Sequence, residues 1–334
     1  MSTGRRPVVE PRRRDVVRIA RVSYAFPAGS RTLPELAAAG ALESDPALLA
    51  TFGFDRVRVA AAETPYALAQ RAAGAVLARP AIDPESIGLL VYGGTPSPLA
   101  YQPGADTGDV ARGLHTTARF KYPGARLHHE LGLVNATLVG VDQLACTTLF
   151  AAVRIARALC ITEGIDRALC VSAEFTPADA GREAIWNITS DAACAVLIER
   201  GGGENRIVAG RTVTKGYYWD CDALRDEIVA SYFPTAKHVI LRTLEEAGWR
   251  ASDVDWVIPH NVSRRSWDVL LGLVRLPNAR LWDANIARDG HTLAGDNFIN
   301  LADALDSGRI EPGAKMLLFA YGYGAHWTAL ALEA

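Results

Sequence analysis

Four residues in three segments have side chains suited to nucleophilic catalysis by a thiol: Cys146, His260, and the pair His291 and Asp296. Cys146 follows apolar residues and precedes the Ala-rich, helix-compatible run 147–160, so we expect its thiol at a helix N-terminus. Backbone N–H groups and the helix dipole favour the nucleophilic thiolate there. A neutral imidazole within hydrogen-bond reach can accept the thiol proton, and we interpret His260 as this base.

The remaining chemistry comes from two glycine-containing segments. Asp296 follows Gly295 at the predicted start of a helix, where it acts either as an N-terminal cap or as the carboxylate that orients His260 or His291. The C-terminal turn Gly322-Tyr323-Gly324 follows a buried strand. Its backbone N–H groups, Tyr323 included, can form an oxyanion hole beside the N–H of Cys146.

The elements that must position these residues alternate between helix and strand and repeat once along the chain. The pattern predicts an α/β layered fold of two pseudo-duplicated halves. In the first half we expect helices over 66–77 and 147–160 and strands over 89–92 and 167–174. In the second half we expect helices over 239–247 and 297–306 and strands over 256–258 and 315–321. Because functional residues gather at strand ends in such folds, the two halves are expected to face each other there.

The domain boundaries follow from glycine and charge patterns. We interpret 1–14 as a flexible, arginine-rich tail, 15–203 as the half with the nucleophile, and 204–334 as the half with His260 and the segment 289–300, which holds His291 and Asp296. The glycine-rich turn at 201–203 separates the halves.

Composition excludes several classes of protein. The 334 residues are 49% hydrophobic with a net charge of −2, which does not indicate nucleic-acid binding. No run of about 18 apolar residues predicts a membrane span. The five cysteines form no CxxC pair, and we expect no metal site, at His115, His128 and His129 or elsewhere. Cys160, Cys170 and Cys194 lie in apolar runs and are expected to be buried thiols of a cytoplasmic protein.

Taken together, these segments resemble the ketosynthase III branch of the thiolase superfamily, from about residue 17 to the C-terminus. The resemblance rests on the turn at Cys146, the segments beginning Pro259-His260-Asn261 and Gly290-His291-Thr292, and the run Gly322-Tyr323-Gly324-Ala325-His326-Trp327. It implies a thiolase-like five-layered αβαβα fold and a homodimer.

The resemblance also implies a ping-pong reaction. Cys146 would take an acyl group from coenzyme A or from a phosphopantetheinyl acyl carrier protein, and would pass it to a small-molecule or carrier-bound acceptor. Arg265, with Asn261, would hold the phosphopantetheine arm or the carrier. No cofactor is implied beyond these substrates.

The main departure from the family lies at His291, where condensing relatives have the asparagine of a Cys-His-Asn set. We therefore expect an acyltransferase of natural-product biosynthesis, of polyketide or fatty-acid type, with Asp296 and His291 completing the polar set. One alternative is a decarboxylative β-ketoacyl synthase III that forms a C–C bond with a malonyl thioester. Another is a non-catalytic partner subunit. Tyr323 replaces the middle glycine of the terminal turn, and 101–121 is longer than the family's usual connection.

Overall fold

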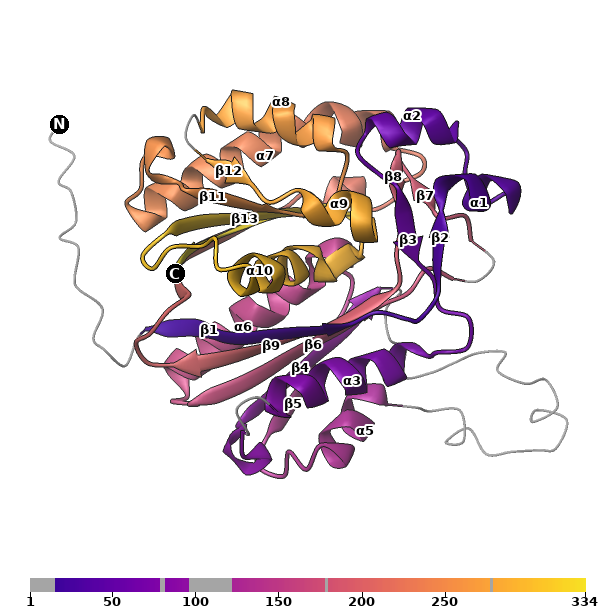
Figure 1. The fold of residues 1–334 in the computed structure, drawn as a ribbon. Helices are drawn as coiled ribbons and strands as arrows, with labels where there is room; N and C mark the ends of the chain where they lie inside the picture. The colour runs from indigo at the N-terminus through magenta and orange to yellow at the C-terminus, as the bar shows by residue number, and fades with distance from the viewer. Residues whose placement is uncertain (1–15, 79–81, 96–121, 178–179, 277–278) are drawn as a thin grey trace, which may run out of the picture.

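The structure is a computed structural model that describes residues 16–78, 82–95, 122–177, 180–276 and 279–334. The predicted tail, the long connection 101–121 and His115 lie outside these residues. The described chain folds into alternating layers of helix and sheet (Figure 1).

Five strands from the first part of the chain form one half of the sheet, in the spatial order β5-β4-β6-β9-β1. These strands are β1 (Val17–Ala25), β4 (Leu89–Thr95), β5 (Thr137–Val141), β6 (Arg167–Glu174) and β9 (Ala192–Arg200). β4 runs parallel to β5 and β6, and β9 runs antiparallel to β6 and β1.

The second part of the chain repeats this arrangement in the order β12-β11-β13-β14-β10. These strands are β10 (Arg206–Thr214), β11 (Trp256–Pro259), β12 (Arg280–Leu281), β13 (Lys315–Gly322) and β14 (His326–Glu333). β11 is parallel to β12 and β13, and β14 is antiparallel to β13 and β10. Because strand order and directions match between the halves, the predicted duplicated α/β fold is confirmed. The proposed division at 201–203 falls between β9 and β10.

Helices cover and separate the two half-sheets, which meet through β1 and β10. In Figure 1, α6 and α10 lie between the half-sheets, α3 and α5 cover the first, and α7 and α8 cover the second. Their bounds are α3 (Pro65–Ala78), α5 (Pro123–Glu130), α6 (Thr148–Thr162), α7 (Arg225–Ala247), α8 (Arg264–Val274) and α10 (Asp296–Asp306). The smaller elements are β2 (Ser30–Thr32), α1 (Leu33–Ala38), α2 (Pro46–Thr51), β3 (Arg56–Arg58), β7 (Glu183–Ala184), β8 (Asn187–Ile188) and α9 (Ala284–Asp289).

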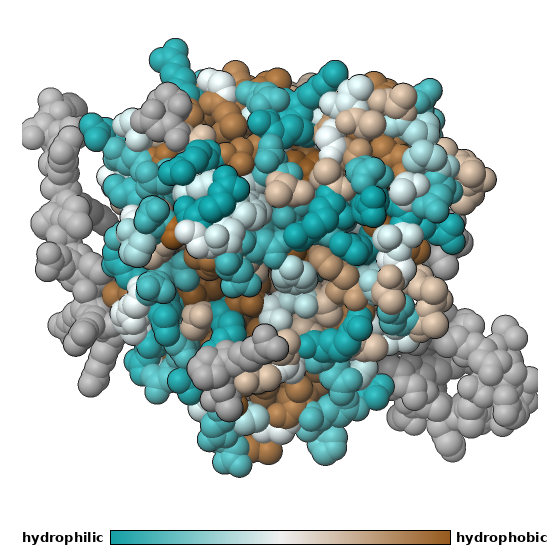
Figure 2. Space-filling model, in the orientation of Figure 1, coloured by the Kyte–Doolittle hydropathy of each residue, from teal (hydrophilic) through white to brown (hydrophobic). Residues whose placement is uncertain are grey.

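The two central helices pack through their apolar faces. Phe150 on α6 and Phe298 on α10 are both buried, with ring centroids 5.1 Å apart. Among the described residues, Ala145–Thr162 has the length and composition of a membrane span, but this stretch lies in the middle layer of the fold. Burial against the first half-sheet and against α10 explains its apolar character. The face shown in Figure 2 carries hydrophilic residues interspersed with hydrophobic ones.

Most predicted elements agree with the structure to within a few residues, but one helix was underestimated. The predicted helix over 239–247 is only the end of α7, which begins at Arg225. Pro234 lies inside α7, and because proline removes a helical hydrogen bond it normally indicates a helix end. Packing of α7 against β10 and β14 keeps the helix continuous through this position.

The expectation for the three core cysteines is confirmed. Cys160, Cys170 and Cys194 are fully buried, and all five cysteines are free. Burial raises the pKa of Cys160 to about 11 and that of Cys170 well above the ordinary thiol value. These three thiols are therefore protonated packing groups.

Candidate active site

Cys146 lies in a strained turn that leads directly into α6. The turn is a single 3-10 turn, Ala145–Thr147, closed by the Thr147 N–H donating to Leu144 O at 3.0 Å. Gln143 and Ala145 have φ angles of 63° and 44°, a region that residues with a side chain rarely adopt. Such strain is typical of turns that present a functional side chain.

The end of β13 packs against this turn. A Cβ atom at Gly322 would lie 2.6 Å from Leu144 O and 3.2 Å from the backbone nitrogen of Cys146, so only glycine fits there. The residue that follows is Tyr323, and its backbone therefore lies beside the nucleophile turn. This proximity supports the predicted oxyanion hole formed by the N–H groups of Cys146 and Tyr323.

His291 is the histidine that contacts the thiol. Its Nε2 lies 3.3 Å from Cys146 Sγ, and its Nδ1 lies 2.5 Å from Asp296 Oδ2. The backbone of His291 is held on both sides, since its N–H donates to Ile188 O and its carbonyl accepts from Ser190 N–H, each at 2.8 Å. The imidazole therefore bridges the sulfur and the carboxylate in a Cys-His-Asp arrangement.

Asp296 is fully buried at the first position of α10 and is held by four hydrogen bonds. Besides His291, it accepts from the Asn261 N–H at 2.6 Å and from the N–H and hydroxyl of Thr292 at 2.5 and 2.6 Å. The carboxylate therefore orients His291 and is not a helix cap. Burial opposes its ionisation, but the attraction of His291 outweighs this and lowers the pKa of Asp296.

The pairing of Asp296 with His291 also changes the pKa of the His291 imidazole. Burial by itself lowers the pKa of His291, but the negative charge of Asp296 and the contact with Cys146 raise it well above the ordinary histidine value. A strongly basic imidazole held against a thiol is suited to accept its proton.

His260 lies beside this arrangement but makes no hydrogen bond to the sulfur. Its ring centroid is 5.5 Å from that of His291, and neither of its nitrogens has a hydrogen-bond partner among the described residues. Burial, and then the charge of His291, lower the pKa of His260 to about 3, so this ring is neutral. We therefore reassign the role of base from His260 to His291, because of these two histidines it is His291 that lies within hydrogen-bond distance of Cys146 Sγ.

The two residues expected to hold the donor differ in their surroundings. Arg265 lines the cavity that leads to Cys146, with its guanidinium 5.5 Å from the centre of the Phe52 ring. The Asn261 side chain is instead part of an internal network: it donates to Gly290 O and accepts from Asn300, each at 2.8 Å. We therefore keep Arg265 as a candidate donor contact and reassign Asn261 to supporting the site.

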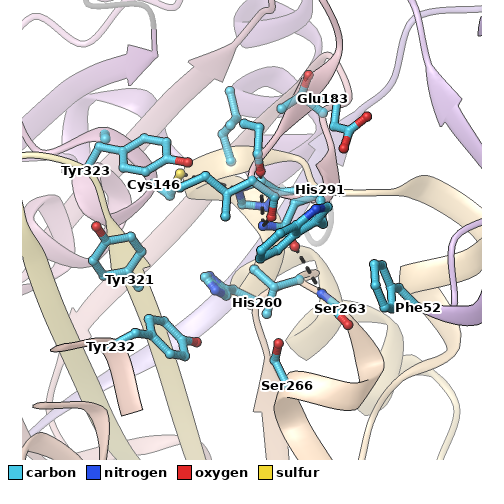
Figure 3. Close-up of a pocket in the computed structure, with 18 of the residues that line it drawn as sticks. Phe52, Cys146, Glu183, Tyr232, His260, Ser263, Ser266, His291, Tyr321 and Tyr323 are labelled. Carbon is cyan, nitrogen blue, oxygen red and sulfur yellow. Dashed lines mark hydrogen bonds between the residues drawn. The ribbon is translucent and has the colours of Figure 1, made fainter. Parts of the chain in front are cut away.

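A cavity of about 560 Å³ reaches Cys146 from the surface. Figure 3 shows residues from several distant segments around it. Its lining is mostly apolar and aromatic and includes Phe52, Phe175, Trp186, Ile228, Val229, Tyr232, Phe233, Val262, Val269, Leu293, Tyr321 and Tyr323. A volume of this size and character suits a small organic ligand.

The hairpin β7–β8 contributes a second strained turn to the rim of this cavity. Ile185 and Trp186 form the two-residue turn with φ angles of 47° and 60°, whereas Asn-Gly is preferred in such turns. We expect the double variant Ile185→Asn, Trp186→Gly to raise the free energy of unfolding in urea by about 1 kcal/mol, because backbone strain is relieved. Trp219→Gly, at an exposed tryptophan outside the cavity, is the control. A turn variant less stable than the wild type would contradict this.

Sequence reasoning missed the polar residues that hold the strand ends. Asn297 Nδ2 donates to Ile258 O and Phe319 O at 2.8 and 3.0 Å, and Asn300 Nδ2 donates to Pro259 O at 2.7 Å. Both asparagines are buried. Asp296 and Asn300 are four residues apart and so lie on one face of α10, and this spacing was the available signal.

Comparison with known protein families shows which family the chain belongs to. Residues 142–216 match the family described as 3-oxoacyl-[acyl-carrier-protein (ACP)] synthase III, and residues 244–334 match its C-terminal family. The chain is a ketosynthase III-like member of the thiolase superfamily. This family consists of acyl-transferring enzymes, and the resemblance inferred from the sequence is confirmed.

Individual relatives agree with this assignment. A β-ketoacyl-[acyl-carrier-protein] synthase III of Streptomyces coelicolor is 38% identical over 89 residues, which cover 27% of this chain and 26% of the relative. The match with this relative thus spans about a quarter of its length. A relative of the same name from Methylococcus capsulatus is 25% identical over 87% of this ketosynthase III-like chain and 90% of its own.

Solved structures show the same fold. The 3-oxoacyl-[acyl-carrier-protein] synthase III of Aquifex aeolicus superposes with a TM-score of 0.79 at 22% identity, over 95% of this chain and 100% of its own. The acyltransferase ChlB3 superposes with a TM-score of 0.79 at 20% identity, over 96% and 98% of the two chains. The thiolase-like fold expected from the sequence is therefore confirmed.

Proposed function

We propose that this protein is an acyltransferase that carries an acyl group on Cys146 and passes it to an acceptor without decarboxylation. The observation that carries the proposal is the linked set Cys146 Sγ, His291 Nε2, His291 Nδ1 and Asp296 Oδ2, with separations of 3.3 and 2.5 Å. This is the order of nucleophile, base and orienting acid that acyl transfer requires. That a structural neighbour is named as an acyltransferase supports the same chemistry.

In the first half-reaction, His291 takes the proton of Cys146 and the sulfur attacks the carbonyl carbon of the donor thioester. The donor is acyl-coenzyme A or an acyl carrier protein, as for the relatives. The carbon–sulfur bond of the donor then breaks, and its thiol leaves with the proton held by His291. The N–H groups of Cys146 and Tyr323 are proposed to bind the oxyanion.

In the second half-reaction, a hydroxyl or amine of the acceptor gives its proton to His291 and attacks the carbonyl carbon of the acyl-enzyme. The bond to Cys146 Sγ breaks, and the sulfur recovers the proton from His291. We further propose a homodimer of the cytoplasm that acts in polyketide- or fatty-acid-type biosynthesis and needs no cofactor beyond its thioester substrate.

A decarboxylative β-ketoacyl synthase III is the second candidate, favoured by the names of the curated relatives. That reaction needs hydrogen-bond donors at the oxygen of the enolate formed from malonyl thioester. Here both nitrogens of His291 are engaged, by Cys146 and by Asp296. Release of CO2 from malonyl thioester, coupled to a ketoacyl product, would favour this candidate over ours.

Intact-protein mass after incubation with acyl-coenzyme A and acyl-carrier donors tests the proposal. We expect the wild type to gain the mass of one acyl group and Cys146→Ala to gain none, because the sulfur is the only proposed attachment point. Cys221→Ala, at a partly exposed free cysteine, is the matched control and should still be loaded. An adduct that persists in Cys146→Ala would contradict the proposal. Unchanged output of the native pathway with that variant would indicate a non-catalytic partner subunit.

A further inference from the structure

One wall of the cavity is formed by three tyrosines in a row, Tyr323, Tyr321 and Tyr232. Tyr323 and Tyr321 have ring centroids 5.8 Å apart at 85°, and Tyr321 and Tyr232 have centroids 5.5 Å apart at 82°. All three line the cavity, and Figure 3 shows them along one side of it. Edge-to-face packing of this kind makes a rigid wall that favours contact with another flat ring.

Polar atoms along this wall have no hydrogen-bond partner within the described part of the chain. The Tyr321 hydroxyl and both nitrogens of His260 are buried without one. The Tyr232 and Tyr323 hydroxyls likewise make no hydrogen bond there. Burial raises the pKa of Tyr232 above the ordinary value, so its hydroxyl is a neutral donor. Because buried polar groups are normally paired, this wall is suited to a ligand that carries its own polar groups.

Apart from His291, the charged side chains that line the cavity lie away from this wall. Glu183 is already occupied, since it accepts from the backbone N–H of Glu43 and from the N–H and hydroxyl of Ser44. Arg265, on α8, has its guanidinium over the ring of Phe52. The tyrosine wall and His260 therefore offer neutral hydrogen-bonding groups and aromatic surface. An anionic ligand would gain no charge pairing from this wall, and a saturated chain would leave its hydroxyls unpaired.

We propose that the acyl acceptor is an aromatic compound that bears hydroxyl groups, and that Tyr232, Tyr321 and His260 position it. This inference rests on the acyl transfer proposed above. The ring lies against the tyrosine wall, and one hydroxyl bonds to Tyr232 or Tyr321. A second hydroxyl gives its proton to His291 while its oxygen attacks the carbonyl carbon on Cys146. The bond from carbon to sulfur breaks, an ester forms, and the thiol regains its proton from His291.

Binding of three alcohols to the free wild-type protein tests the inference. The probes are 4-hydroxybenzyl alcohol, benzyl alcohol and cyclohexylmethanol, which differ in turn by the ring hydroxyl and by aromaticity. We expect 4-hydroxybenzyl alcohol to bind about 3–10-fold more tightly than benzyl alcohol, because that is the affinity that one additional hydrogen bond contributes. Cyclohexylmethanol should bind most weakly, because it has no aromatic ring to pack against the tyrosines. Equal affinity for all three would overturn the inference.

Single-atom variants make the test specific. Tyr232→Phe and Tyr321→Phe keep the rings and remove one hydroxyl each, so the preference for 4-hydroxybenzyl alcohol over benzyl alcohol should shrink in at least one of them. Tyr217→Phe, at an exposed tyrosine outside the cavity, should keep it. A preference unchanged in both cavity variants would refute the assignment. Because binding is measured without a donor, this result is independent of whether Cys146 becomes acylated.

Transfer from the acyl-enzyme gives the second readout. On wild type loaded with an acyl group, 4-hydroxybenzyl alcohol should remove the adduct mass faster than cyclohexylmethanol does, with an ester of the matching mass as product. Equal rates for the two alcohols would overturn the acceptor class while leaving acyl transfer intact. Failure to load Cys146 at all would instead count against the proposed function.

Discussion

Replacing His291 with alanine is expected to slow acylation of Cys146 by about 10²–10⁴-fold, the usual contribution of a positioned acid–base group. The physical reason is that His291 is the histidine within hydrogen-bond distance of Cys146 Sγ, and that Asp296 keeps its imidazole strongly basic. The rate of appearance of the acyl-enzyme, followed by intact mass at a fixed donor concentration, measures the effect.

Two other histidines provide the comparison. His260→Ala should slow acylation less than His291→Ala, because His260 makes no hydrogen bond to the sulfur. His238→Ala, at an exposed position on α7, should leave the rate unchanged. If His260→Ala slowed acylation more than His291→Ala, His260 would be the base after all.

The variant His291→Asn introduces the asparagine that condensing relatives have at this position. A gain of malonyl decarboxylation in this variant would show that position 291 selects between the two reactions.

Replacing Asp296 with alanine is expected to lower the free energy of unfolding by about 3–5 kcal/mol, the usual cost of removing one partner of a buried ion pair. Asp296 is fully buried and accepts four hydrogen bonds, so alanine would leave His291, Thr292 and Asn261 with unpaired donors. Urea denaturation measures this loss. Asp306→Ala, at the exposed end of the same helix, is the control and should change stability little.

The stability difference between the wild type and Asp296→Ala should also depend on pH. The pKa of Asp296 is lowered in the folded state, so its contribution is present above the unfolded value near 3.8 and is lost as pH falls further. The pKa of His291 is raised, so its contribution is present below the unfolded value near 6.5 and is lost as pH rises toward the folded value. The difference should therefore be largest between about pH 4 and pH 6.5. A difference that did not change with pH would argue against an ion pair.

Much of the fold could be predicted from local patterns. The strand β6 and the helix α10 match their predicted ranges closely, because apolar runs and glycine turns are local signals that depend on only a few neighbouring residues. The N-terminal part of α7 could not be predicted, since tertiary packing overrides the break that Pro234 normally indicates. The hairpin β7–β8 was also missed, because Ile185-Trp186 lacks the residues that turns of this type prefer.

The sequence by itself determined which residues enter the site: Cys146 and Asp296 lie at helix starts and His260 directly follows β11, while His291 follows Gly290 in the segment that leads into α10. Only the tertiary structure decided their roles. Which imidazole reaches the sulfur depends on how the segment after Gly290 is held between Ile188 and Ser190, a contact between parts of the chain about 100 residues apart. The tyrosine wall likewise joins α7 to the end of β13. Spacing along the chain carries no information on such distances, because they are set by the packing of the two halves.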